Sequence, residues 1–216
     1  MSERIALITG ASRGFGAAVA EALAAKGWHV VAVARTVGAL EELDDRIKAA
    51  GGGSATLVPL DITDDDGLAR MGAAVFERWG GADLWLHSAI AAAPLSPAAH
   101  VPAGDWDKVV AVNIRATQRL IAMIEPLLQA REGTAVLPVE PDVPGRKFMA
   151  AHGAAKAAQE AIWNSWARET ARAGHKVITF APRPMPTALR ARFYPGEDRA
   201  ALTHPKEEAA RLLASL

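Results

Sequence analysis

Short apolar runs alternate with longer amphipathic segments along the whole chain. The short runs are rich in Val, Ile, Leu and Ala, a pattern typical of parallel strands that are buried on both faces. Strands are predicted over residues 5–8, 29–34, 55–60, 84–88, 134–139 and 176–181. The longer segments repeat apolar side chains at helical spacing. Helices are predicted over residues 17–26, 37–50, 65–79, 105–130, 148–173 and 206–213.

The alternation of strand and helix predicts an α/β fold. Helical crossovers between consecutive strands imply a single doubly wound, Rossmann-type parallel sheet of strand order 3-2-1-4-5-6, with ligands bound beyond the carboxyl ends of the strands. The length of 216 residues fits one such domain, residues 1–216. Pro141 and Pro144 exclude regular structure from residues 140–146, and Pro126 predicts a kink near the end of the helix at 105–130.

Composition narrows the possible functions. Lys+Arg and Asp+Glu each number 24, so no net charge favours nucleic acid or an anionic membrane surface, and neither partner is expected. The absence of cysteine excludes disulfides, thiol nucleophiles and thiolate metal sites, and we expect no metal. No apolar stretch approaches membrane-spanning length, and the first strand begins too early for a signal peptide to precede it. We therefore expect a cytoplasmic protein.

Residues 9–16, Thr-Gly-Ala-Ser-Arg-Gly-Phe-Gly, form a glycine-rich turn between the first strand and the first helix. A turn of this kind points the free N–H groups and partial positive charge of a helix N-terminus at a phosphate. The spacing G-x-x-x-G-x-G after Thr9 resembles that of the short-chain dehydrogenase/reductase family, and the general resemblance covers nearly the whole chain. The alternative is an ordinary tight turn.

The resemblance implies a nicotinamide cofactor. Asp61 matches the family residue that hydrogen-bonds the adenine, although it also suits the turn before a helix, and Thr187 matches the residue that approaches the nicotinamide amide. The residues expected to contact the cofactor are Gly10, Ser12, Arg13, Gly14, Phe15, Gly16, Arg35, Asp61, Ile62, Ala89, Lys156 and Thr187.

Basic side chains near the second strand favour NADP(H) over NAD(H). In this fold an acidic residue at the end of that strand binds a ribose 2′-OH, whereas a basic group suits a 2′-phosphate. Ala34 occupies the acidic position, Arg35 follows it, and Arg13 lies in the glycine turn. Two guanidinium groups could bind one phosphate together. Alternatively, both arginines are solvated surface charges.

The chain departs from the family pattern in two cofactor elements. The Asn-Asn-Ala-Gly that follows the fourth strand in the family is His-Ser-Ala-Ile at residues 87–90, and the Pro-Gly after the sixth strand ends in Arg183. The side chains of Ile90 and Arg183 could therefore crowd the nucleotide cleft. Because the chain stops at Leu216, the family's seventh strand is expected to be absent. Strand six would then be an edge, or be covered by something else.

The catalytic residues that the resemblance implies are only partly present. In the family a Tyr moves the substrate proton, a Lys supports that Tyr and holds the ribose, a Ser orients the carbonyl, and an Asn completes a proton path. Lys156 and Asn113 match the Lys and the Asn. The Tyr position, four residues before the lysine, is His152, and the Ser position falls on Val139 or Glu140.

Histidine can act as a general acid near neutral pH. However, a lysine cation opposes an imidazolium cation unless a carboxylate such as Glu140 offsets it, and imidazole is shorter than phenol. His152 could also be an ordinary polar residue at a helix start. Two functions therefore stay open. One is an NADP(H)-dependent oxidoreductase acting on an unknown carbonyl or alcohol through an altered acid. The other is a catalytically inactive NADP(H)-binding protein that serves as a sensor or partner subunit.

The last part of the chain suggests a closer relationship and a subunit interface. Residues 186–198, together with His87, look similar to a bacterial branch of the family labelled YciK-like oxidoreductases. This region forms the substrate lid in the family, and Tyr194 could contact a substrate there. The family commonly pairs helices four and five, here 105–130 and 148–173, with their counterparts. We therefore expect a homodimer or homotetramer.

Overall fold

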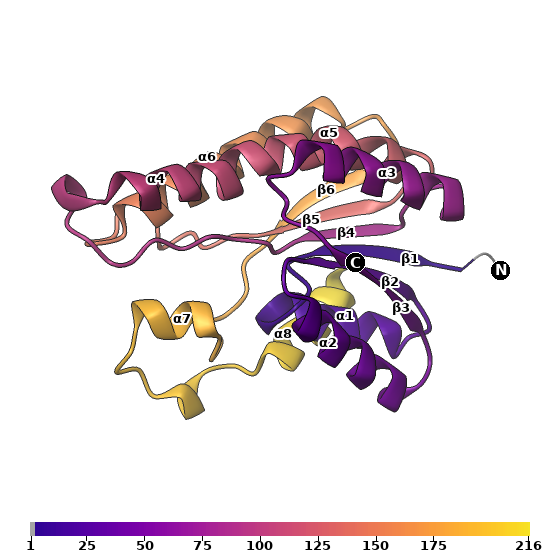
Figure 1. Cartoon of the computed structure of the whole chain (residues 1–216), viewed down its shortest axis with the longest axis horizontal. Helices are drawn as coiled ribbons and strands as arrows, with labels where there is room; N and C mark the ends of the chain where they lie inside the picture. The colour runs from indigo at the N-terminus through magenta and orange to yellow at the C-terminus, as the bar shows by residue number, and fades with distance from the viewer. Residues whose placement is uncertain (1–2) are drawn as a thin grey trace.

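The computed structural model describes residues 3–216 and contains one six-stranded sheet of order β3-β2-β1-β4-β5-β6 (Figure 1). Every neighbouring pair of strands is parallel. The strands are β1 (Ile5–Thr9), β2 (His29–Ala34), β3 (Ser54–Pro59), β4 (Leu84–His87), β5 (Thr134–Pro138) and β6 (Lys176–Phe180). The predicted fold class and strand order are therefore confirmed.

Helices cover both faces of the sheet. One layer contains α1 (Gly14–Ala24), α2 (Val37–Ala50) and α8 (Pro205–Ser215), and the other contains α3 (Asp65–Trp79), α5 (Ala116–Gln129) and α6 (Ala150–Glu169) (Figure 1). The central strand β1 serves both layers because its side chains alternate in direction. Ala6 and Ile8 belong to the core beneath α1, and Ile5 and Leu7 to the core beneath α5.

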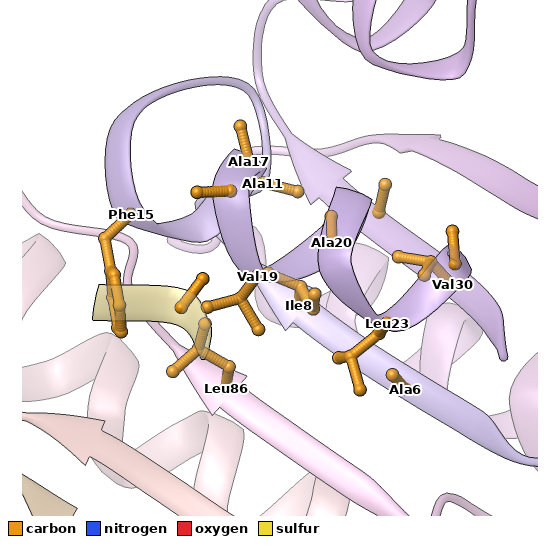
Figure 2. Close-up of a cluster of buried hydrophobic side chains, with 14 of the residues drawn as sticks. Ala6, Ile8, Ala11, Phe15, Ala17, Val19, Ala20, Leu23, Val30 and Leu86 are labelled. Carbon is orange, nitrogen blue, oxygen red and sulfur yellow. The ribbon is translucent and has the colours of Figure 1, made fainter. Parts of the chain in front are cut away.

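The core between α1 and the sheet consists of small and branched side chains. Figure 2 shows Val19 and Leu23 of α1 beside Ile8 of β1 and Leu86 of β4, all fully buried or nearly so. Short side chains such as Ala20 let the helix lie close to the strands. The N-terminus of α1 is thereby held directly after β1, where a phosphate would have to bind.

The helix predicted over residues 105–130 has an interruption in its middle. It consists of α4 (Ala103–Val109), a π-helical segment η2 (Val110–Arg115) and α5, which continues past Pro126. A π-helical turn contains an extra residue, and such turns are common at functional sites because they redirect a side chain. The buried residue of η2 is Asn113.

Three short helices lie outside the ranges predicted to be helical. They are η1 (Ala98–His100), η3 (Arg199–Ala201) and α7 (Ala188–Phe193), of which α7 lies beyond the carboxyl end of the sheet (Figure 1). The helix predicted from residue 148 begins instead at Ala150. Phe148 has φ +67°, a left-handed conformation that cannot begin a right-handed helix.

Within residues 3–216, β6 has β5 as its only partner strand and forms an edge of the sheet. The chain then passes through α7 and η3 to α8, which packs against α1 and places Arg211 over the ring of Phe180 at the end of β6. None of the helices in this described part of the chain is long and apolar enough to cross a bilayer.

Candidate active site

The turn between β1 and α1 can be built only with glycine at two of its positions. Gly10 has φ +83°, and a Cβ atom placed there would lie 2.5 Å from the backbone nitrogen of Ala89. A Cβ on Gly16 would lie 2.3 Å from the carbonyl oxygen of Gly10 and 2.4 Å from Oγ of Ser88. Both glycines are therefore required because the end of β4 packs directly on the turn.

The N-terminus of α1 has a conformation suited to an anion. Arg13 occupies the N-cap position with an exposed side chain, and no side chain of the described residues caps the helix there. The N–H groups of the first turn have no acceptor within the helix by virtue of their position. Together with the glycine backbone, they form a cradle that a phosphate fits.

Other predicted residues of the turn differ in where their side chains point. Phe15 is buried and stacks on Phe180 of β6, with ring centroids 5.7 Å apart, so only its backbone can face a ligand. Ser12 is half-buried. A Cβ on Gly14 would lie 3.3 Å from the methyl group of Thr187, so the segment after β6 meets the turn at this point.

Arg35 and Asp61 lie together at the ends of β2 and β3. Their closest side-chain atoms are 3.9 Å apart, and both side chains are exposed. Asp61 accepts hydrogen bonds from the backbone nitrogen and hydroxyl of Thr63, at 3.0 and 2.8 Å. Burial tends to raise the pKa of Asp61, but the Thr63 hydrogen bonds and the charges of Arg35 and Lys108 hold it below its ordinary value.

Ile62, also predicted to contact the cofactor, is buried in the core beneath α5. Its backbone is thus the part that remains for a ligand. Arg13 is exposed, as Arg35 is, so a ligand phosphate has access to each guanidinium group.

The altered segment after β4 is held by bonds that stabilise the turn. Oγ of Ser88 donates to the carbonyl oxygen of Thr9 at 2.9 Å, which fixes the end of β4 to the end of β1. Asn113 brackets the backbone of Ala91, accepting from its nitrogen and donating to its oxygen at 2.8 Å each. Ile90 is half-buried between these two anchors.

Arg183 is drawn toward α8. Its backbone nitrogen and Nε donate to the buried carboxylate of Glu208 at 3.0 and 2.8 Å. Arg211 donates to the same carboxylate at 2.7 Å, and its guanidinium group lies 4.1 Å from the ring centre of Phe180. The side chain of Arg183 is therefore tied to the C-terminal helix.

Lys156 is buried on α6, and its ammonium group is hydrogen-bonded to two groups of the protein. Nζ donates to the carbonyl oxygen of Pro138 at 2.7 Å and to Oε1 of Gln159 at 3.3 Å. Burial lowers the pKa of Lys156, and the carboxylates of Glu140 and Glu160 oppose that effect. Gln159 is a contact that the family pattern did not suggest, although its i+3 spacing from Lys156 places both on one helix face.

His152 lies one helical turn before Lys156 and is only 1% exposed. Its Nε2 lies 3.5 Å from Oε1 of Glu140, too long for a strong hydrogen bond, and neither ring nitrogen has another partner within residues 3–216. The ring of Phe193 from α7 lies against the imidazole, with centroids 4.7 Å apart. His152 is thus enclosed by a carboxylate and an apolar lid.

Glu140 is the residue that joins these groups. Its Oε1 lies 3.9 Å from Nζ of Lys156, while the neighbouring Val139 is buried in the core. Burial alone would raise the pKa of Glu140, but His152, Lys156 and Arg190 together bring it below its usual value. Of the two residues considered for the serine position, only Glu140 presents a polar side chain to the site.

The lid helix α7 is held to the β5–α6 segment by its aromatic residues. Phe193 packs with Val143 and Met149. The ring of Tyr194 lies 4.9 Å from the guanidinium group of Arg146 and 4.1 Å from that of Arg190. Tyr194 therefore contacts two cations and the lid, and Phe193 is the aromatic residue that reaches His152.

Thr187 links the lid to the glycine turn. Its hydroxyl oxygen accepts a hydrogen bond from the backbone nitrogen of Arg190 at 3.2 Å and so caps α7. Its methyl group faces Gly14 as described above. The residues predicted for the cofactor and those predicted for catalysis thus lie beyond the carboxyl ends of the strands. Thr187 and α7 connect the two groups.

Comparison with known proteins identifies the family of this chain. Residues 4–198 match the family model described as short chain dehydrogenase. An uncharacterized oxidoreductase of Staphylococcus epidermidis is 30% identical over 192 residues, which cover 88% of this chain and 81% of that protein.

Solved structures of two similar proteins have the same fold. A metagenomic short-chain oxidoreductase in complex with NADP is 27% identical, with a TM-score of 0.84 over 99% of this chain and 91% of that one. The oxidoreductase YciK from E. coli is 26% identical, with a TM-score of 0.88 over 98% and 88%. The protein therefore belongs to the short-chain dehydrogenase family.

Proposed function

We propose that the protein is an NADP(H)-dependent oxidoreductase that interconverts a small carbonyl compound and its alcohol. The observation that carries this proposal is the position of Glu140. Its carboxylate lies 3.5 Å from His152 and 3.9 Å from Lys156, the two residues that the resemblance matches to the tyrosine and lysine of the family. A carboxylate beside an imidazole favours the protonated form and so offsets the lysine charge.

The cofactor would be held by the glycine turn and its neighbours. The backbone of residues 10–16 would bind the pyrophosphate, and Asp61 and Thr187 would meet the adenine and the nicotinamide ends. Arg13 and Arg35 would bind a 2′-phosphate, which is why we propose NADP(H) in preference to NAD(H). A relative of this fold whose structure contains NADP supports the choice.

The residues of the site divide the reaction between them. NADPH held by these residues would supply the hydride that reduces the carbonyl carbon. His152 donates the proton that the carbonyl oxygen takes up, and Glu140 stabilises the imidazolium form before the transfer. Nζ of Lys156 stays hydrogen-bonded to the carbonyl oxygen of Pro138 at the end of β5. Because Phe193 covers the imidazole, α7 has to move before a substrate can reach His152.

The test is NADPH oxidation with a broad panel of aldehydes and ketones, using the wild type and Glu140→Gln. We expect turnover by the wild type and a kcat lower by about tenfold or more in the variant, because the amide cannot stabilise an imidazolium. Glu132→Gln, at an exposed position, serves as the control. Equal turnover by wild type and Glu140→Gln would contradict the assigned role.

The burial of His152 favours a second candidate function. A ring that is 1% exposed and covered by Phe193 is shielded from any substrate while α7 is closed. The protein could then bind NADP(H) as a sensor or partner subunit without turnover. Calorimetric titration with NADPH separates the two candidates: tight binding with no oxidation on the whole panel selects the binding protein.

We also propose a homodimer or homotetramer built through α5 and α6. The exposed face of α6 carries the small side chains of Ala154, Ala157 and Ala161, which allow another helix to approach closely. Sedimentation should show a dimer or tetramer for the wild type and a smaller species for Ala157→Glu. A wild type that sediments only as a monomer would remove this proposal.

A further inference from the structure

A set of buried polar side chains lies behind Lys156, between the sheet and the helix layer that contains α5 and α6. Its members come from β1, β4, η2, α5 and α6, and each is hydrogen-bonded to at least one other member. They are Thr9, His87, Asn113, Thr117, Gln159 and Lys156, all buried. Buried polar groups that are fully hydrogen-bonded hold one arrangement, because breaking any link leaves a group without a partner.

One branch starts at Lys156. Its Nζ donates to Oε1 of Gln159, and Nε2 of Gln159 donates to the hydroxyl of Thr117 at 2.9 Å. The hydroxyl of Thr117 in turn donates to the carbonyl oxygen of Asn113 at 2.8 Å. The single proton of this hydroxyl is thereby used, so any further contact with its oxygen must come from a donor.

The second branch reaches Thr117 through His87. Nε2 of His87 lies 3.0 Å from the Thr117 oxygen, and Nδ1 lies 2.8 Å from the Thr9 oxygen. Because Thr117 can only accept here, Nε2 carries the proton and Nδ1 accepts from Thr9. Nε1 of Trp85 donates to Thr9 at 3.4 Å. Each of these hydrogen bonds then has one donor and one acceptor.

The surroundings of His87 favour the neutral ring. The indoles of Trp85 and Trp163 lie against it, with ring centroids 5.4 and 6.4 Å away. Burial, with the charge of Lys156 adding to it, lowers the pKa of His87 to about 3. A neutral imidazole has one N–H group, so one ring nitrogen donates and the other accepts. The nitrogen that bears the proton therefore determines which group donates in each hydrogen bond of this branch.

We propose that Thr117 and His87 are positioning residues that hold Lys156 and Asn113 in place on either side of the site. The hydroxyl of Thr117 is the junction, since it receives both branches and fixes the carbonyl oxygen of Asn113, whose side chain brackets Ala91. The effect on NADP(H) binding rests on the proposed function, in which Lys156 and Asn113 would flank the bound cofactor.

The experiment compares the wild type with Thr117→Val, which removes the hydroxyl at nearly constant shape, and Thr117→Ser, which keeps it. The direct readouts are the ¹⁵N shifts of the His87 ring and the ¹³C signal of the Lys156 ε-methylene. We expect the neutral Nε2–H form of His87 in the wild type and in Thr117→Ser. In Thr117→Val the proton should move to Nδ1, which can still donate to Thr9, and the Lys156 signal should shift and broaden.

NADPH binding by the same three proteins connects positioning to function. Binding should weaken by about tenfold in Thr117→Val and stay within about twofold in Thr117→Ser, as loss of one buried hydrogen bond implies. A wild type that does not bind NADPH overturns the proposed function. The His87 and Lys156 signals would still test whether Thr117 and His87 position Lys156 and Asn113. Where Thr117→Val does not fold, Gln159→Met takes its place and should change the Lys156 signal alone.

Three results would overturn the inference. The first is a wild-type His87 in the Nδ1–H form or as imidazolium at neutral pH. The second is a Thr117→Val protein with unchanged His87 and Lys156 signals. The third is a Thr117→Ser protein that changes as much as Thr117→Val, because the methyl group and not the hydroxyl would then be responsible.

Discussion

The β1–α1 turn and the β5–α6 segment both lie beyond the carboxyl ends of the strands. The turn is determined by backbone atoms, and the β5–α6 segment by side chains. In the turn, backbone atoms lie so close that a Cβ on Gly16 would come within 2.3 Å of Gly10. In the β5–α6 segment, side chains determine the site: Glu140, His152 and Lys156 form a charged group that Phe193 covers.

This difference suggests a physical reason why the turn has the glycines that the resemblance implies, whereas Glu140 and His152 differ from the implied serine and tyrosine. A close backbone contact allows no residue except glycine, so the turn cannot change without loss of the fold. Charged side chains can be exchanged when a new partner compensates, as Glu140 does for His152 and Lys156. Nucleotide binding and proton transfer can therefore be tested separately in this protein.

The largest expected effect tests the backbone constraint of the turn. Gly10→Ala forces an L-residue into φ +83° with its Cβ 2.5 Å from Ala89, and we expect the free energy of unfolding to fall by roughly 3–5 kcal/mol. Urea-induced unfolding measures the change. NADPH binding should be lost as well.

Gly38→Ala is the matched control for this change. Gly38 lies in α2 with open space where a Cβ would be, so alanine should raise stability by about 0.5–1 kcal/mol. If Gly10→Ala were as stable as the wild type, backbone contact could not be the reason for the glycines of the turn.

The next effect tests the side-chain chemistry. His152→Gln should lower kcat by about 100-fold, because an amide cannot donate the proton that the imidazolium ring supplies, while the Kd for NADPH stays within about twofold. Steady-state NADPH oxidation and calorimetry measure the two quantities. His100→Gln, on the exposed η1, is the control. Unchanged turnover in His152→Gln would mean that the acid lies elsewhere.

The third effect is the pH dependence of stability that comes from His87, which is buried behind both regions. The pKa of His87 is lowered to about 3 in the folded protein, so on acidification the unfolded chain takes up a proton that the folded protein does not. Its contribution to stability is therefore present above the ordinary histidine range and is lost as pH falls toward 3. Between about pH 7 and pH 5 the expected loss is about 2 kcal/mol.

Urea unfolding of the wild type and His87→Gln at these two values isolates this term. The variant should lose about 2 kcal/mol less than the wild type between them. Glu140 does not interfere, because its pKa is lowered and its contribution is lost only when pH falls below the ordinary carboxyl range. The same acid sensitivity in both proteins would argue against a neutral, buried His87.

The smallest effect tests cofactor preference. Arg35→Ala should weaken NADPH binding by about tenfold, or about 1.4 kcal/mol, because one charge-assisted contact to the 2′-phosphate is lost. NADH, which lacks that phosphate, should bind almost as before. Arg172→Ala, exposed and beyond the end of α6, is the control. Equal losses for both nucleotides would assign Arg35 a role other than phosphate recognition.

Much of the fold could be predicted from local pattern. The apolar runs indicated six parallel strands in the observed order, and three predicted ranges, 29–34, 37–50 and 65–79, coincide with β2, α2 and α3. Period and glycine spacing act over a few residues, which is why they can be interpreted without knowing the partners. The interruption at η2 and the lid helix α7 were not predicted because each depends on distant contacts.

The candidate site shows where such prediction ends. Glycine spacing located the turn, and helical spacing placed His152 next to Lys156, but no pattern indicated that Phe193 would cover the imidazole. Similarly, Arg183 is withdrawn to Glu208, 25 residues along the chain. Contacts of this kind depend on how α7 and α8 fold back, which the identity of either residue does not reveal.

The sequence by itself determined the sheet, its order and the glycine turn, because burial periodicity and backbone sterics are local properties of a chain. The tertiary structure alone decided that Glu140 faces both His152 and Lys156, that Phe193 covers the site, and that Thr117 joins its two sides. The charge and hydrogen bonding of a buried group depend on atoms brought near it by folding, and these come from elements far apart in the chain.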